Sequence, residues 1–120
     1  VATSEQAKSI KDNMMNPVIF NTFIPLPTLA ANHPKFKPEG GYWRGPIWLD
    51  QSQFAINGLE KYKFTKEANQ LAYKLLHNAE GVTIKGEAIR ENYQPITGKG
   101  LESFNFSWSA AHYMLLLLKD

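Results

Sequence analysis

The chain has 120 residues, 43% of them hydrophobic, which is the size and composition of one small globular domain. Its net charge of +2 is too small to indicate a nucleic-acid partner or an anionic membrane, and neither is expected. The longest strongly apolar run, residues 114–118, is too short to cross a bilayer. Cysteine is absent, which excludes disulfides and thiolate metal sites but leaves the compartment open.

The N-terminal third predicts one helix followed by a long connection. Thr3 and Gln6 have the spacing of a capping box, and apolar residues recur at helical spacing until Asn16 and Pro17 end the helix. Prolines then return throughout residues 17–46, so no regular element is expected there. The segment is rich in apolar side chains, and we predict a buried loop of a length that is often functional.

The middle of the chain predicts two helices joined by a tight turn. Asp50 is placed to cap a helix over residues 51–62, and Thr65 to cap a second helix that ends before Gly81. The apolar residues of the second helix form a stripe at i, i+3, i+4 and i+7. Only residues 63–64 separate the two helices, so they should fold back as an antiparallel αα-hairpin.

Residues 82–100 predict a second long loop, with a short β-hairpin around residues 85–86. A last helix starts at Asn105 or Ser107 and is apolar on most sides, which predicts burial in something larger. Tight turns alternating with long loops are typical of an α/α toroid. We therefore expect an all-α fold of antiparallel αα-hairpins with long loops, forming an incomplete toroid. The chain has no initiator methionine and is expected to be part of a longer protein.

The first candidate site is the segment 40–51, GGYWRGPIWLDQ. Indole faces can stack on the C–H groups of a sugar ring while arginine and carboxylate groups bond its hydroxyls. The glycines and the proline allow tight turns that present these side chains. The alternative, with equal weight, is that the three aromatic residues belong to the core and Arg44 is a surface charge.

The second candidate is Glu91, which stands in the irregular segment 89–98 (IRENYQPITG) next to Arg90, Asn92 and Tyr93. A loop glutamate is most often solvated and inert. Near aromatic side chains and a guanidinium, however, it could serve as a general base toward a water molecule.

The remaining motifs carry less chemistry. Trp108, in the segment 103–112, could be either core or sugar platform. His33, His77 and His112 have no metal-site spacing and the chain has no phosphate-binding or dinucleotide motif, so no metal and no cofactor are expected.

Three motifs taken together, 42–48 (YWRGPIW), 91–95 (ENYQP) and 106–110 (FSWSA), resemble the C-terminal part of glycoside hydrolase family 63. That family contains processing α-glucosidases that act on mannosyl-oligosaccharides, and bacterial relatives that cleave α-glucosides. Residues 16–27 resemble the bacterial branch in particular. The resemblance covers nearly the whole chain in order.

The resemblance implies that residues 1–120 are a single C-terminal segment of an (α/α)6 barrel that hydrolyses α-glucosidic bonds with inversion. Inversion needs an acid and a base about 6.5–9.5 Å apart. Glu91 corresponds to the general base, whereas the family's acid is an aspartate from an earlier segment without a counterpart here. The positions that match the sugar pocket are Tyr42, Trp43, Arg44 and Trp48, with Tyr93 and Trp108 as weaker matches.

The expected partners are an oligosaccharide with α-linked glucose and the rest of the parent enzyme, in the periplasm or cytoplasm of a bacterium. Without the acid, the isolated chain is expected to be inactive. It is also expected to self-associate through the apolar sides of its first and last helices.

Three alternatives stay open. The chain could belong to a trehalase-like or debranching-type hydrolase, which shares the barrel and the mechanism. It could be a non-catalytic carbohydrate-binding or helical interaction module, which a solvent-facing Glu91 far from Trp43 and Arg44 would support. An enzyme that uses Asp50 as the acid partner of Glu91 is a third, weaker alternative.

Overall fold

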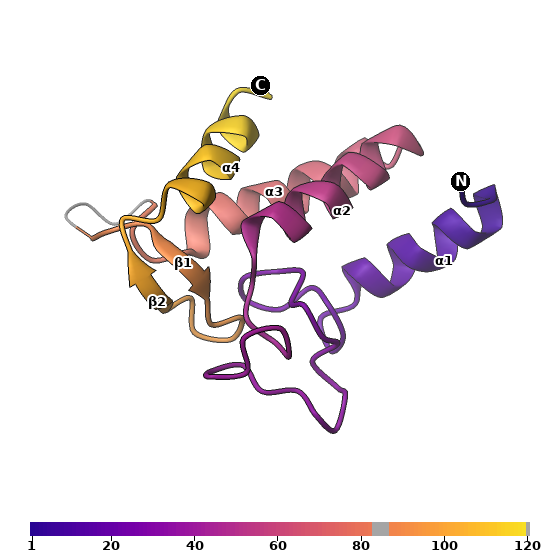
Figure 1. Ribbon diagram of the computed structural model, residues 1–120. Coiled ribbons are helices and arrows are strands. Elements are labelled where there is room, and N and C mark those ends of the chain that lie inside the picture. The colour runs from indigo at the N-terminus through magenta and orange to yellow at the C-terminus, as the bar shows by residue number, and fades with distance from the viewer. Residues whose placement is uncertain (83–86, 120) are drawn as a thin grey trace.

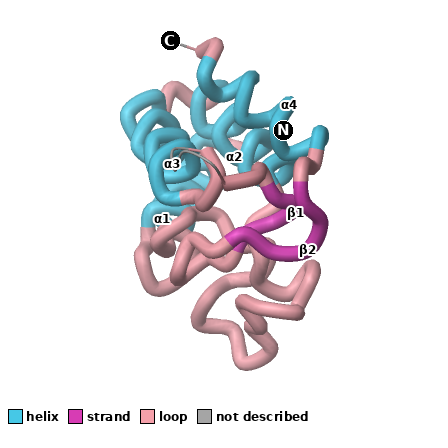
Figure 2. Tube along the Cα trace, turned by 90° about the vertical axis from the view of Figure 1, so that its left-hand side faces the viewer, coloured by secondary structure: helices cyan, strands magenta, loops and turns pink. Residues whose placement is uncertain are grey.

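The structure is a computed structural model that describes residues 1–82 and 87–119. Within these ranges it contains the helices α1 (Ser4–Met15), α2 (Leu49–Lys61), α3 (Thr65–Asn78) and α4 (Ser107–Leu117), and the strands β1 (Arg90–Tyr93) and β2 (Gly100–Phe104). Helices α2 and α3 lie side by side, α4 leads away from the two strands, and α1 stands apart on the other side (Figure 1). The long loops gather at one end of the molecule, below the helices (Figure 2).

The ends of α1 follow the sequence prediction. The backbone N–H of Thr3 donates to Oε1 of Gln6 at 2.8 Å, and the N–H of Gln6 donates to Oγ1 of Thr3 at 3.2 Å, which completes the capping box. The helix ends at Met15, because Asn16 takes the extended conformation that a following proline favours.

The predicted αα-hairpin of α2 and α3 is confirmed, but both predicted caps are wrong. Helix α2 begins at Leu49 with Trp48 as its N-cap, so Asp50 lies in the first turn and makes no capping bond. Helix α3 begins at Thr65 itself, with Phe64 as its N-cap. In both cases packing fixes the start of the helix, because Leu49 and Phe64 contact the hydrophobic core.

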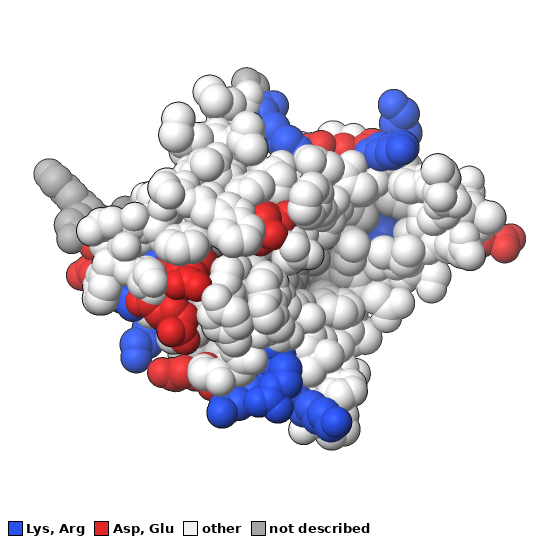
Figure 3. Space-filling model, viewed as in Figure 1, with Lys and Arg blue, Asp and Glu red and all other residues white. Residues whose placement is uncertain are grey.

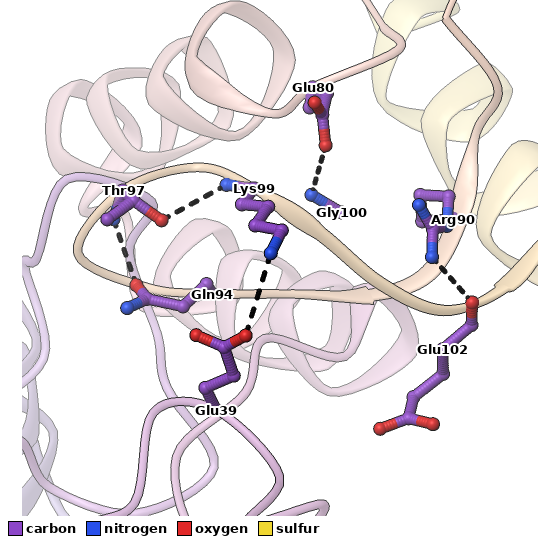
Figure 4. Close-up of polar contacts among 8 residues, drawn as sticks. All are labelled: Glu39, Glu80, Arg90, Gln94, Thr97, Lys99, Gly100 and Glu102. Atoms are coloured by element: carbon purple, nitrogen blue, oxygen red, sulfur yellow. Dashed lines mark hydrogen bonds and ion pairs between the residues drawn. The ribbon is translucent and has the colours of Figure 1, made fainter.

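The small antiparallel sheet corrects the all-α prediction. The hairpin turn expected at residues 85–86 lies outside the described residues, whereas the observed turn joins β1 to β2 through residues 94–99. Oε1 of Gln94 accepts the backbone N–H of Ile96 at 2.5 Å and that of Thr97 at 2.9 Å, and so closes this turn (Figure 4). A side-chain bond of this kind is hard to read from sequence, because it competes with many equivalent local bonds.

A β-bulge interrupts the hairpin beside Glu91. Arg90 is paired with Phe104 and Asn92 with Leu101, so Glu91 alone faces two residues of β2, Glu102 and Ser103. Glu102 takes a left-handed backbone conformation with φ of 58°. The Arg90 side chain holds the bulge by donating from Nη2 to the carbonyl oxygen of Glu102 at 2.6 Å (Figure 4). Bulges of this kind often redirect a side chain next to an active site.

The core joins the helices to the long loop between α1 and α2, as the apolar content of that loop predicts. Ile24 and Leu26 of the loop are buried with residues from α2, α3, β1 and α4. The ammonium of Lys74 on α3 donates to the carbonyl oxygens of Asn21 at 3.1 Å and Thr22 at 2.5 Å. The core consists of Ile24, Leu26, Ile47, Leu49, Ile56, Leu59, Ala68, Leu71, Leu75, Ala79, Tyr93, Tyr113 and Leu116.

Helix α4 is apolar around most of its surface, as predicted. Tyr113 and Leu116 are buried, whereas Met114, Leu115 and Leu117 are more than half exposed. Within the described residues, no helix combines the length and the apolar character needed to span a bilayer.

Candidate active site

The segment 40–48, here called the aromatic loop, meets Glu91 in space. Tyr42 of this loop and Glu91 lie 49 residues apart in the sequence. A two-bond bridge joins them: Ile47 N–H donates to the Tyr93 carbonyl at 2.8 Å, and Tyr93 N–H donates to the Ile47 carbonyl at 3.1 Å. The loop thus pairs with the end of β1, the strand that carries Glu91. The phenol of Tyr42 completes the junction by donating to Oε1 of Glu91 at 3.0 Å.

Beside this junction the aromatic side chains form a stack. The rings of Trp43 and Trp48 are 4.2 Å apart and inclined by 15°, and Tyr42 meets both of them edge-on. Trp48 is only 3% exposed, whereas Trp43 and Trp108 are 47% and 45% exposed. Trp48 is therefore the buried member of the stack, whereas Trp43 and Trp108 are each partly exposed.

Tyr42 and Ser103 hold the carboxylate of Glu91, with a bond to each oxygen. Besides the Tyr42 phenol on Oε1, the backbone N–H of Ser103 donates to Oε2 at 3.3 Å. The Ser103 side chain first, and then the Tyr42 phenol and the Ser103 backbone N–H, lower the pKa of Glu91 below its ordinary value through hydrogen bonding, although partial burial acts the other way. In turn, the carboxylate raises the pKa of the Tyr42 phenol. At neutral pH the site therefore contains an ionised carboxylate beside a neutral phenol.

Ser103 and Ser109 are parts of the site that the sequence did not reveal. The hydroxyl of Ser109 on α4 donates to the main-chain carbonyl of Glu91 at 2.9 Å, and so ties β1 to the helix. The N–H of Ser103 is free to bond the carboxylate because the bulge removes it from the strand ladder. Finding either residue would have required the register of the hairpin.

Three residues considered for the site from the sequence make no hydrogen bond to the Glu91 carboxylate in the described structure. Tyr93 is completely buried, and its hydroxyl accepts the Arg90 N–H at 2.9 Å, so it supports β1 and has no surface for a ligand. Arg44 is exposed, and its guanidinium makes no polar contact with the described residues. Asp50 is 8% exposed; its Oδ2 accepts from Gln51 at 2.8 Å, while Oδ1 is buried without a partner in the described structure.

A groove of about 700 Å³ lies between α1 and α2, visible as the uncharged hollow near the centre of Figure 3. Trp43 and Gln51 line it together with apolar residues of α1 and of the long loop, whereas Glu91 does not. Trp43 thus lies between the groove and the Tyr42–Glu91 pair. Among the residues that the structure describes, no group of His, Asp and Glu side chains forms a metal site.

The chain matches known proteins over most of its length. Residues 1–109 match the family model of the mannosylglycerate hydrolase MGH1-like glycoside hydrolase domain. The mannosylglycerate hydrolase of Thermus thermophilus is 37% identical over 86 residues, which are 72% of this chain and 19% of that protein. The enzyme of the same name from Rubrobacter radiotolerans is 33% identical over 78 residues, 65% of this chain and 16% of that protein. The chain therefore spans about a fifth of the length of these relatives.

Solved structures match the fold of the entire chain. A crystal structure of a family 63 mannosylglycerate hydrolase from Thermus thermophilus in complex with glucose has a TM-score of 0.81 and 27% identity, and the match covers 98% of this chain and 28% of that one. The same enzyme in complex with Tris and D-glycerate has a TM-score of 0.80 and 28% identity, covering 98% and 27% of the two chains. The chain belongs to the mannosylglycerate hydrolase-like glycoside hydrolases of family 63.

Proposed function

We propose that this chain is the C-terminal part of an inverting glycoside hydrolase, in which Glu91 is the general base. The observation that carries the proposal is the Glu91 carboxylate, ionised and held through both oxygens beside exposed indole rings. A general base must be charged and fixed before the substrate arrives, and this arrangement meets both requirements. In this proposal, the rest of an (α/α)6 barrel and the acid come from other parts of the parent enzyme; the chain covers 19% of the length of the Thermus relative.

The reaction then follows the inverting scheme. Glu91 takes a proton from a water molecule, whose oxygen attacks the anomeric carbon from the face opposite the leaving group. The acid of the parent enzyme gives its proton to the glycosidic oxygen as that bond breaks. Trp43 and Trp108 supply ring faces against which the sugar can stack, and the unpaired guanidinium of Arg44 supplies donors for oxygen atoms of the substrate.

Mannosylglycerate is the first candidate substrate, because the names of the relatives point to it. Both bacterial relatives carry the name mannosylglycerate hydrolase, and a structural neighbour has been solved with D-glycerate. An α-glucoside is the second candidate, because another neighbour structure contains glucose. Both substrates need the same base, so the assignment of Glu91 does not depend on which of them is used.

The test is Glu91→Gln in the full-length enzyme that carries this chain. The amide keeps the size of the side chain but cannot accept a proton, so kcat should fall by about 10²–10⁴-fold. Hydrolysis of mannosylglycerate and of a set of α-glucosides is measured side by side, and NMR of the first product gives its anomeric configuration. The matched control is Glu87→Gln, the same substitution at an exposed residue between α3 and β1, which should retain full activity. Unimpaired turnover by Glu91→Gln would refute the role of this residue.

A further inference from the structure

The backbone and the ring of Tyr42 are both fixed by contacts that direct its hydroxyl toward Glu91. Its backbone is left-handed, with φ of 55°, a conformation that costs a non-glycine residue about 1–2 kcal/mol. Its carbonyl oxygen accepts the indole N–H of Trp48 at 3.0 Å, and its ring meets the rings of Trp43 and Trp48 edge-on. These contacts fix both ends of the residue and leave the hydroxyl directed at the carboxylate.

The loop around Tyr42 has little freedom to move. A side chain at Gly41 would place its Cβ 2.1 Å from the carbonyl oxygen of Lys37, so only glycine allows the two backbone segments to approach this closely. The N–H of Lys37 donates to the Arg44 carbonyl at 2.7 Å, and the N–H of Arg44 donates to the Gly41 carbonyl at 3.0 Å. The loop thus forms a closed turn that presents the phenol in one place.

We propose that Tyr42 is a positioning residue for the base, which orients the Glu91 carboxylate toward the attacking water, and is not itself a sugar contact. The inference rests on the proposed role of Glu91 as general base. The phenol takes up one acceptor site on Oε1, and the Ser103 N–H takes up one on Oε2. The carboxylate can then turn in neither direction without losing a donor, and it still has free lone pairs for water.

The hydrogen bonds that hold the Glu91 carboxylate come from neutral groups and not from a neighbouring cation. Arg90 precedes Glu91 in β1, but its guanidinium lies 3.7 Å from the ring centre of Phe104 and donates to the Glu102 carbonyl. Glu102, on β2, adds a negative charge that raises the pKa of the Tyr42 phenol and so keeps it protonated. Ser109, from α4, is uncharged. Removal of the phenol hydroxyl therefore removes the donor to Oε1, while Ser103 still bonds the carboxylate.

The experiment compares Tyr42→Phe with wild type in the full-length enzyme, using Tyr73→Phe as the control. Tyr73 is an exposed tyrosine of α3, where loss of a hydroxyl should have no effect on activity. For Tyr42→Phe we expect kcat to fall by about tenfold, the usual effect of losing one hydrogen bond to a charged group, with KM nearly unchanged. The acid limb of the pH–rate profile should move to higher pH, because the carboxylate has lost a donor.

A spectrophotometric titration of the phenols tests the contact without turnover. Subtracting the titration curve of Tyr42→Phe from that of wild type isolates the ionisation of the Tyr42 phenol. In the Glu91→Gln background that ionisation should move to lower pH, because the neighbouring negative charge is gone.

A raised KM with an unmoved acid limb would make Tyr42 a substrate contact and overturn the inference. An unmoved phenol titration in Glu91→Gln would overturn it as well. If Glu91→Gln is inactive while Tyr42→Phe behaves as wild type, the inference fails and the base assignment stands. Full activity of Glu91→Gln would overturn both.

Discussion

Replacing Gly41 with alanine tests whether the loop that carries Tyr42 is as confined as its contacts indicate. The added Cβ would lie 2.1 Å from the Lys37 carbonyl oxygen and 2.9 Å from the Lys37 Cβ. Ordinary van der Waals contact begins at 3.4 Å, so the two backbone segments must separate by about 1 Å. Overpacking of this kind costs about 1–3 kcal/mol. A displacement of about 1 Å would also break the 3.0 Å hydrogen bond between Tyr42 and Glu91.

The assay combines stability with the geometry of the stack. Urea unfolding measures the loss of stability, and near-UV circular dichroism reports the coupling of the stacked Trp43 and Trp48 rings. In the full-length enzyme that carries this chain, a misplacement of about 1 Å should also lower kcat by about 10²-fold. The control is Gly58→Ala, because a Cβ there meets no atom within 4 Å and alanine should stabilise α2 by about 0.5–1 kcal/mol. If Gly41→Ala matches wild type in stability and in near-UV spectrum, the reasoning about the confined loop is wrong.

Two further predictions concern the start of α1 and the pH dependence of stability. Thr3→Ala removes the acceptor for the Gln6 N–H and should cost about 1 kcal/mol in urea unfolding; an unchanged midpoint would show that the capping box does not stabilise the helix. Because the pKa of Glu91 is lowered on folding from 4.5, its ionised form contributes stability that is present above pH 4.5 and is lost as the pH falls through the folded value. The stability difference between wild type and Glu91→Gln should therefore change on acidification below pH 4.5, and a difference that stays constant over this range would contradict the linkage.

Local signals were sufficient to predict the helices. The capping box of α1, the Asn16–Pro17 stop and the apolar stripe of α3 each involve residues within a few positions of one another, and each appears in the structure. Asp50 and Thr65 failed as caps because tertiary packing set where α2 and α3 begin, and a local preference of about 1 kcal/mol does not override it.

The sequence named candidate residues for the site, whereas their geometry could not be predicted from it. Tyr42, Trp43 and Glu91 were identified from motif and residue type. The roles of Ser103 and Ser109 depend on the hairpin register and on how α4 meets β1, which no local pattern encodes. Tyr93 illustrates the converse: it lies two residues after Glu91, where strand alternation alone would give both side chains the same face, yet it is completely buried in the core.

The extra residue opposite Glu91 has a consequence for how this protein can vary in length. Surface connections usually tolerate insertions and deletions. Deleting Ser103 would leave Glu102 alone opposite Glu91 and turn the bulge into a regular ladder, with Arg90 still paired with Phe104. The Glu91 carboxylate would then lose the Ser103 amide that holds it. We therefore expect this short stretch to keep a constant length in any active variant.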